Sequence, residues 1–319
     1  MISPILQVKN LTVHLNQRRV QYPLVESLSF DLYPGRTLAI IGESGSGKSV
    51  TAQALMQLLP TPLFSLSGNV VFQETELLSA SRKELQAIFG TKMAMIFQNP
   101  HTSLNPVFTI GKQFQELLDT HLHLSRQAGR EKIIQALVDT GFHHPELCLN
   151  LYPHQLSGGM LQRISIAMAL LSSPEIVIAD EPTTALDVSV QYQILQLLKK
   201  LQNKLGMSLL IITHDMGVVA EMADDVLVLY AGNMVEYASV YDIFHHPRHP
   251  YTQDLLASRP SAKEKTFRTI PGQPPCYDSL PSGCCYSPRC LKTYPKCTLK
   301  PPPLHNINTN HKVRCWLYE

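Results

Sequence analysis

Residues 42–49 read Gly-Glu-Ser-Gly-Ser-Gly-Lys-Ser, the pattern G-x-x-x-x-G-K-S, and they directly follow an apolar run at residues 38–41. In this pattern, glycines let successive backbone N–H groups turn toward one anion. The lysine reaches the outer phosphates of a nucleotide, and the serine hydroxyl can bind Mg²⁺ at the start of a helix. The sequence therefore predicts a nucleotide-phosphate site made by Gly42, Ser44, Gly45, Gly47, Lys48 and Ser49.

The composition narrows the classes of protein to which the chain can belong. With 319 residues, of which 44% are hydrophobic, it can bury a substantial core. Its 27 basic and 25 acidic residues leave a net charge of only +2, which does not indicate nucleic-acid binding. The first residues lack the basic and apolar regions of a signal peptide, and no apolar run is long enough to span a membrane. We expect a soluble, cytoplasmic chain with no nucleic-acid partner.

The segment before residue 38 predicts an antiparallel sheet. Short apolar and β-branched runs at residues 5–8, 11–15 and 27–32 are separated by polar breaks. Tyr22 lies in this region, and its ring either stacks on an adenine base or packs on the sheet edge. The sequence leaves both interpretations open.

Other patterns predict the elements that follow the phosphate loop. They are strands at 67–72 and 93–97, amphipathic helical structure over 110–140, a helix opening after Leu156, and a hairpin of strands 226–230 and 234–237 with Gly232 and Asn233 at its turn.

Two apolar runs end in polar residues. Residues 176–179 lead into Asp180 and Glu181, and residues 208–213 lead into His214. Such runs are typical of buried parallel strands, whose carboxyl ends meet at a nucleotide site. Asp180 is then expected to support Mg²⁺ and Glu181 to activate water for attack on the outer phosphate. For Asp180 alone, capping of a helix is the alternative.

Six of the seven cysteines fall in the last part of the chain, where prolines also concentrate. In a cytosolic nucleotide-binding protein, this clustering indicates a metal site rather than disulfides. The spacing lacks paired C-x-x-C motifs, so zinc and a four-iron four-sulfur cluster are about equally compatible with it. We expect a separate, loop-rich module over residues 259–319.

In their order along the chain, these motifs resemble those of the nucleotide-binding subunit of an ATP-binding-cassette (ABC) transporter, and the likeness covers nearly the whole sequence. The matching elements are the Walker A at 42–49, Gln98 at the Q-loop, the signature at 156–160, the Walker B at 176–181, the D-loop at 184–187 and the switch histidine His214. The signature departs from LSGGQ at Met160. This departure matters little, because Ser157 and the amides of Gly158 and Gly159 are the expected phosphate donors.

The resemblance implies an α/β fold, a P-loop ABC ATPase core with an antiparallel β subdomain and a helical subdomain at about residues 99–160. The cassette would cover residues 1–258, followed by the cysteine-containing module. It also implies a sandwich of two cassettes, in which each ATP lies between one Walker A and the partner's Ser157, Gly158 and Gly159. A glycine-rich segment that opens a helix is itself an anion site, which agrees with this arrangement.

The resemblance assigns further roles in the hydrolysis of ATP to ADP and phosphate. Gln98 and His214 would sense the outer phosphate, and Gln98 would join Ser49 and Asp180 around Mg²⁺. Asp187 would communicate across the cassette dimer.

Longer strings are similar to the oligopeptide/dipeptide importer branch of the family; they are residues 97–106, 152–160, 179–188, 249–252 and 270–272. This branch implies two membrane permease subunits, a second and related ATP-binding chain, an indirect extracytoplasmic solute-binding protein, and a peripheral location on the cytoplasmic face of the membrane. Nickel, heme or an oligosaccharide remains an alternative cargo. A soluble ABC ATPase of DNA repair or translation is a weaker alternative, because the chain has no coiled-coil insertion and no second cassette.

The same branch carries a comparable cysteine tail, and this likeness favours a 4Fe–4S cluster over Zn²⁺ or free thiols. The expected ligands are Cys284, Cys290, Cys297 and Cys315, with Cys285 as a surplus thiol. A metal here would hold together a segment with few apolar residues.

Overall fold

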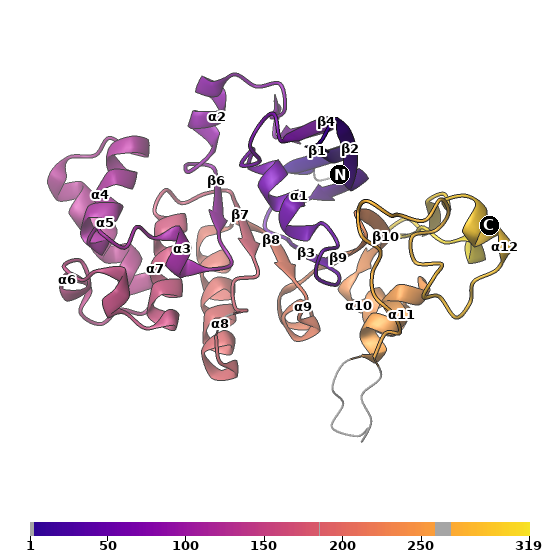
Figure 1. The fold of residues 1–319 in the computed structure, drawn as a ribbon. Helices are drawn as coiled ribbons and strands as arrows, with labels where there is room; N and C mark the ends of the chain where they lie inside the picture. Colours follow the sequence, from indigo (N-terminus) through magenta and orange to yellow (C-terminus); the bar gives the residue numbers. More distant parts are fainter. Residues whose placement is uncertain (1–2, 185, 259–268) are drawn as a thin grey trace. The chain divides into compact units, whose positions relative to one another are not determined.

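The structure is a computed structural model that describes residues 3–184, 186–258 and 269–319. Ala185 of the expected D-loop lies outside the described residues. The expected domain boundary falls between residue 258, which is described, and residue 259, which is not. The chain divides into two compact units: the first comprises Met1–Tyr33, Thr37–Ser79 and Ile212–Glu319, and the second comprises Pro34–Arg36 and Ala80–Ile211. Figure 1 labels the helices and strands of both.

The first unit contains the expected antiparallel sheet, in the order β2-β1-β4-β5. Its strands are β1 (Leu6–Gln17), β2 (Val20–Leu32), β4 (Phe64–Phe72) and β5 (Thr75–Glu76). The two apolar runs predicted as separate strands are joined in β1. The polar break between them is a β-bulge, where the pairing register shifts and Asn10 has a φ of +50°.

A second group of strands in the first unit is built around the apolar run before the phosphate loop. All five residues of β3 (Thr37–Ile41) are buried, and β3 runs parallel to β9 (Asp225–Tyr230). Antiparallel pairing then leads from β9 to β10 (Asn233–Ser239), β12 (His311–Val313) and β11 (His305–Asn308). The C-terminal residues thus extend the sheet beyond β10.

The hairpin between β9 and β10 differs from its prediction by one residue. Its turn is Ala231-Gly232, with φ values of +44° and +77°, and Asn233 pairs with Tyr230 as the first residue of β10. A Cβ on Gly232 would lie 2.6 Å from the carbonyl oxygen of Leu24. The close approach to β2 therefore adds to the backbone requirement for glycine at this position.

The first unit also contains helices, several of which pack on these strands. They are α1 (Lys48–Leu55), α9 (Met216–Met222), α10 (Val240–His245), α11 (Pro250–Ala257) and α12 (Pro295–Leu299), with a 3-10 turn at Trp316–Tyr318. One core cluster joins Ala39 and Ile41 of β3 to Tyr230, Tyr251 and Tyr286. The C-terminal residue Tyr286 is thus part of the same core as the strand that leads into the phosphate loop.

The second unit is mainly helical. It contains α2 (Arg82–Ile88), β6 (Met93–Ile96), α3 (Pro100–Ser103), α4 (Ile110–His121), α5 (Arg126–Asp139), α6 (Pro145–Cys148), a 3-10 turn (Pro153–Gln155), α7 (Gly158–Leu170), β7 (Ile176–Asp180) and α8 (Val188–Leu205). Strand β8 (Ser208–Thr213) crosses from this unit into the first along the chain. The stretch expected to be helical over 110–140 is two helices, capped by Thr109 and Ser125, whose apolar faces share one core with α7.

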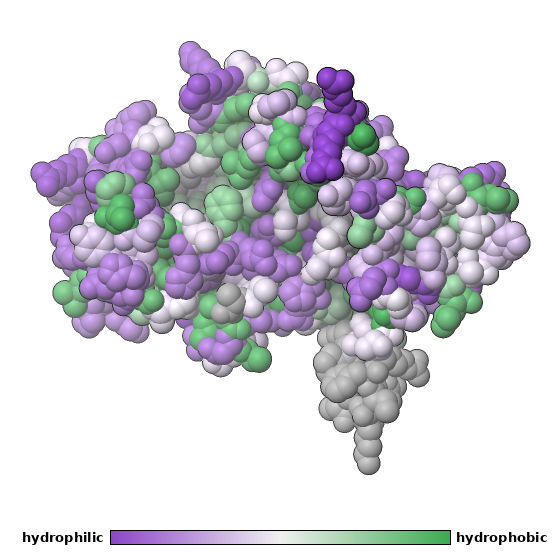
Figure 2. All heavy atoms as spheres, in the orientation of Figure 1, coloured by the Kyte–Doolittle hydropathy of each residue, from purple (hydrophilic) through white to green (hydrophobic). Residues whose placement is uncertain are grey.

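The described helices are all too short or too polar to cross a lipid bilayer. Hydrophilic residues cover much of the face drawn in Figure 2, and apolar residues lie among them in small groups.

Candidate functional site

The phosphate loop connects β3 to α1 in a conformation that only glycine adopts readily. Gly42, Gly45 and Gly47 have φ values of +156°, +78° and +100°. A Cβ on Gly42 would lie 2.1 Å from the carbonyl oxygen of Leu229, so this position has no room for a side chain. The loop therefore lies directly against β9.

Lys48 is the first residue of α1, and its buried side chain folds back over the loop. Its Nζ donates hydrogen bonds to the carbonyl oxygens of Gly42 at 2.8 Å and Glu43 at 2.9 Å. Ser49 follows in the first turn, while Ser44 and Gly45 are exposed. The N–H groups at the start of α1 are thus at the loop, as an anion site requires.

In the second unit, Gln98 and Glu181 meet at the ends of two parallel strands. β6 pairs with β7 so that Ile96 lies opposite Ala179, and the same register carried two residues further puts Gln98 opposite Glu181. Gln98 Nε2 donates a hydrogen bond of 2.8 Å to Glu181 Oε2. The pairing of these strands therefore brings together two of the residues predicted from sequence.

The two acidic residues after the apolar run of β7 have different surroundings. Asp180 is 4% exposed and is the last residue of the strand. Glu181 is half-buried, and its φ of +45° turns the chain out of the strand. Thr184 Oγ1 donates a second hydrogen bond, of 2.9 Å, to Glu181 Oε2. Two neutral donors thus hold one carboxylate oxygen of Glu181.

Two further predicted residues of the second unit cap helices. Ser157 precedes α7, and its Oγ accepts the backbone N–H of Met160 at 3.3 Å. Asp187 precedes α8, and its Oδ1 accepts the N–H of Val190 at 3.0 Å. Hydrogen bonds from Ser189 and Val190 lower the pKa of Asp187. Both capping residues are exposed at helix N-termini, where backbone N–H groups favour anions.

The remaining predicted residues of the ATP site lie in the first unit. His214 is exposed directly after β8. Tyr22 lies in β2, and its ring meets the ring of Tyr277 edge-on, with the ring centroids 5.5 Å apart. An aromatic residue of the C-terminal segment thus contacts the candidate adenine-binding side chain.

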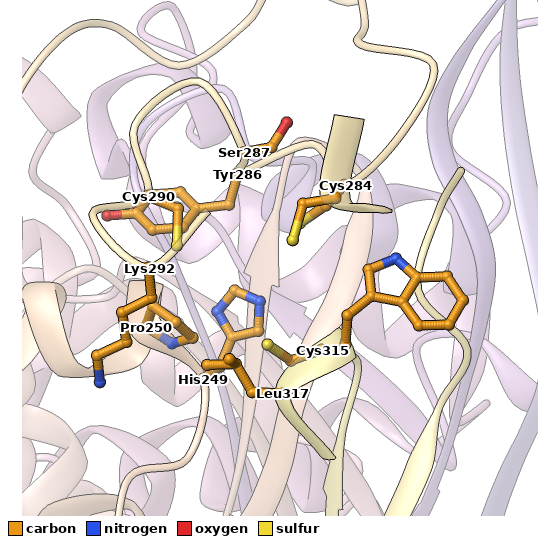
Figure 3. Close-up of a pocket in the computed structure, with 11 residues that line it drawn as sticks. His249, Pro250, Cys284, Tyr286, Ser287, Cys290, Lys292, Cys315 and Leu317 are labelled. Atoms are coloured by element: carbon orange, nitrogen blue, oxygen red, sulfur yellow. The ribbon is translucent and has the colours of Figure 1, made fainter. Parts of the chain in front are cut away.

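The four cysteines selected from sequence line one pocket in the C-terminal part (Figure 3). Cys284, Cys290, Cys297 and Cys315 contribute to its wall together with His249 and Trp316. Cys276 is exposed, and Cys285 Sγ accepts a hydrogen bond of 3.6 Å from Asn233 Nδ2. Neither of these two cysteines lines the pocket.

The ring of His249 lies among the pocket sulfurs in Figure 3. Its Nδ1 accepts the backbone N–H of Tyr251 at 3.0 Å, and burial lowers its pKa to about 4, so Nε2 carries the single ring proton. This buried N–H has no hydrogen-bond partner among the described residues. Burial also raises the pKa of Cys284 to about 12, so a thiolate there requires a nearby cation.

The described part of the chain contains no three His, Cys, Asp or Glu side chains grouped closely enough to hold a single metal ion.

Sequence reasoning missed a contact between the C-terminal segment and the phosphate loop. Arg289 forms a two-pronged ion pair with Glu43, at 2.6 and 3.0 Å, although 246 residues separate them. No local pattern could have indicated this pair. The sequence indicated only that Glu43 lies in the phosphate loop at residues 42–49, and it gave no indication of its partner.

Comparisons with known proteins agree with the sequence motifs. A family model described as "ABC transporter" matches residues 25–184, and one described as "Oligopeptide/dipeptide transporter, C-terminal region" matches residues 235–297. The chain is 44% identical to the oligopeptide transport ATP-binding protein OppD of Bacillus subtilis, over 99% of this chain and 89% of that protein. It is 45% identical to the dipeptide transport ATP-binding protein DppD of the same organism, over 100% and 96%.

Among solved structures, the dimeric ATP-binding cassette MJ0796 bound to ADP and Pi is 28% identical to this chain. The TM-score is 0.65, and the match covers 74% of this chain and 98% of that one. The expected cassette fold is therefore confirmed.

Proposed function

Because this chain belongs to the ABC transporter family and is an ATPase of that type, we propose that it powers a membrane importer of oligopeptides or dipeptides. The observation that carries this proposal is the near full-length similarity, at 44–45% identity, to ATP-binding proteins of oligopeptide and dipeptide transport. The match of residues 235–297 to the C-terminal region of such transporters supports the same cargo.

In the proposed ATP site, the phosphates lie on the loop and the start of α1. The backbone N–H groups of Gly42, Ser44, Gly45 and Gly47 and the Nζ of Lys48 bind them, and the Ser49 hydroxyl binds Mg²⁺. Gln98 and Asp180 complete the surroundings of the metal, and Tyr22 is the candidate for stacking on adenine. The φ values of the three glycines and the buried position of Lys48 support this assignment.

Glu181 is the proposed base that activates water, and Gln98 and His214 respond to the outer phosphate. The hydrogen bond from Gln98 supports a base whose carboxylate is oriented before water arrives. Because phosphoryl transfer needs little covalent chemistry from the protein, most of the rate would come from positioning and charge neutralisation.

A second cassette is proposed to complete each ATP site. Ser157, Gly158 and Gly159 would bind the phosphates held by the partner's Walker A, and Asp187 would contact the partner across the dimer. The exposed N-terminus of α7 supports this role, as does the dimeric state of the similar MJ0796 cassette. The partner is proposed to be a related chain, giving a heterodimer.

The proposed membrane partners are two permease subunits, fed by an extracytoplasmic solute-binding protein. The helical subdomain at about residues 99–160 would contact the permeases, placing the chain peripherally on the cytoplasmic face. Exposed apolar side chains in this segment, Val107, Leu147 and Met160, offer contact area. We further propose that the ABC domain covers residues 1–258 and that residues 259–319 are a metal-binding module, whose described part packs against that domain.

We propose that this module binds a 4Fe–4S cluster through Cys284, Cys290, Cys297 and Cys315. The four cysteine thiolates would be the ligands of such a cluster. The support for this assignment is that all four cysteines line one pocket. The unpartnered N–H of His249 also fits, because cluster sulfurs accept hydrogen bonds. The cluster would act as a structural clamp.

The test of the transport function is purification of the tagged chain from detergent-solubilised membranes, followed by reconstitution into liposomes. We expect two permeases and a second ATP-binding chain to co-purify, and ATP to drive uptake of labelled oligopeptides. Uptake of nickel, heme or an oligosaccharide instead of peptides would contradict the assignment of peptides as the cargo. Recovery of the chain without any membrane protein would contradict the transport function itself.

A further inference from the structure

The C-terminal module reaches the phosphate loop through the side chain of Arg289. This side chain is only 4% exposed, while that of its partner Glu43 is 25% exposed. The two guanidinium NH groups each contact one carboxylate oxygen of Glu43, at 2.6 and 3.0 Å. A paired contact of this kind fixes orientation as well as distance, which a lysine could not do.

Other groups hold the guanidinium in place independently of Glu43. Its Nε donates to the carbonyl oxygen of Pro271 at 2.8 Å, and one NH group donates to the Tyr230 hydroxyl at 3.2 Å. The guanidinium carbon also lies 5.9 Å from the centroid of the Tyr286 ring. Contacts with the C-terminal module and with β9 therefore position Arg289 independently of its pairing with Glu43.

Glu43 is the loop residue on which several contacts converge. Its side chain pairs with Arg289, its backbone N–H donates to the Tyr251 hydroxyl at 2.8 Å, and its carbonyl oxygen accepts from Lys48 Nζ at 2.9 Å. The residue that Arg289 holds is thus also one that positions the phosphate-binding lysine.

The charge of Glu43 matters because this loop binds a polyanion. An unpaired carboxylate beside the phosphates would repel them, and the repulsion is stronger where burial limits solvent screening. Arg289 supplies the compensating charge from a nearly buried position.

We propose that Arg289 is a positioning residue for the ATPase, which neutralises Glu43 and fixes the start of the phosphate loop for MgATP. Affinity for ATP thereby depends on a residue of the C-terminal module, outside every motif of the cassette. This inference rests on the ATPase activity and not on the cargo or on the cysteine cluster.

The test is MgATP binding to the full-length chain by titration calorimetry, with three variants at Arg289 and Glu43 and one control variant. We expect Arg289→Ala to raise the Kd for MgATP on the order of tenfold, as loss of a charge partner near bound phosphate implies. Glu43→Gln should change the Kd little, since its amide oxygen still accepts from Arg289 and no carboxylate remains. The double variant Arg289→Ala with Glu43→Gln should bind more tightly than Arg289→Ala alone, because the unpaired carboxylate is gone.

The matched control is Lys312→Ala, which removes a positive charge from the same module. Lys312 lies at β12, beside the Tyr237 ring at 5.9 Å, and it should leave the Kd unchanged. An unchanged Kd in Arg289→Ala would overturn the proposal, and so would a double variant as weak as Arg289→Ala. If Arg289→Ala does not fold, Arg289→Lys carries the test. It keeps the charge but loses the paired contact, so the neutralising role predicts a Kd within a few-fold of the unmodified chain, and a Kd as weak as expected for Arg289→Ala would overturn that role.

Discussion

Gln98 Nε2 donates a 2.8 Å hydrogen bond to Glu181 Oε2, because the parallel register of β6 and β7 places the two residues opposite each other just beyond the strand ends. Thr184 donates to the same oxygen. These two hydrogen bonds orient the carboxylate that would take a proton from water in the proposed mechanism.

Replacing Glu181 with Gln should preserve ATP binding and stop hydrolysis. The amide is nearly the same size but a far weaker base, so we expect kcat to fall by at least about 100-fold. The Kd for MgATP should stay close to that of the unmodified chain, and cassette dimers should accumulate with ATP. Steady-state phosphate release measures kcat, titration calorimetry measures the Kd, and gel filtration measures the dimers. Turnover near the normal rate would remove Glu181 as the base.

Replacing Gln98 with Ala should impair hydrolysis less than loss of Glu181 does. The variant removes one of the donors that orient the carboxylate, and we expect kcat to fall about tenfold. The magnesium concentration for half-maximal activity should also rise, because Gln98 is proposed to lie beside the ion. The thermal unfolding midpoint is the control and should not move, since Gln98 is exposed. If the magnesium concentration for half-maximal activity did not change, the proposed place of Gln98 beside the ion would be wrong.

Two glycines of the phosphate loop provide a matched pair for stability. Gly42→Ala places a Cβ 2.1 Å from the Leu229 carbonyl oxygen, whereas the space beside Gly45 is open. We expect Gly42→Ala to lower the free energy of unfolding by about 3 kcal/mol or more. Gly45→Ala should cost about 1 kcal/mol from its positive φ alone. Urea denaturation of both variants checks this, and equal losses would contradict the steric explanation.

Local patterns in the sequence predicted most of the elements that position the site. The apolar runs before residue 42 and before Asp180 are the buried strands β3 and β7, and residue 158 begins a helix as expected. Periodicity and capping determine such features over a few residues. The family and the cassette fold are likewise confirmed, whereas the roles of the individual site residues stay predictions.

Features that depend on distant contacts could not be predicted. The hairpin turn lies one residue earlier than expected, where Gly232 passes close to Leu24 of another strand. The pairing of Arg289 with Glu43 joins segments 246 residues apart. Neither contact leaves a periodic or compositional trace, so only the folded structure reveals it.

The proposed 4Fe–4S site predicts that six Cys→Ser variants fall into two groups, four that lose the cluster and two that keep it. Replacing Cys284, Cys290, Cys297 or Cys315 with Ser should abolish the visible absorption of the cluster. The iron content should fall below the about four atoms per chain expected of the unmodified protein. Cys276→Ser and Cys285→Ser are the controls and should retain both, because neither residue lines the pocket. Anaerobic purification with iron, sulfide and zinc analysis measures the outcome. Full zinc occupancy without sulfide would contradict the cluster.

His249→Asn tests the unpartnered N–H in the cysteine pocket. Asn retains a side-chain acceptor for the Tyr251 N–H at the start of α11 but cannot extend a donor to the same place. We expect the midpoint potential of the cluster to become more negative, because a hydrogen bond to sulfur stabilises the reduced and more anionic state. His246→Asn, at an exposed histidine, is the control. Equal potentials in all three proteins would exclude the hydrogen bond.

The most direct test of the central claim is substrate-stimulated ATP hydrolysis by the reconstituted transporter. We predict that a solute-binding protein loaded with short peptides raises the rate of phosphate release, and that Glu181→Gln in this chain abolishes the increase. No stimulation by peptides of any length, with stimulation by a nickel, heme or oligosaccharide complex instead, would contradict assignment of the chain to a peptide importer.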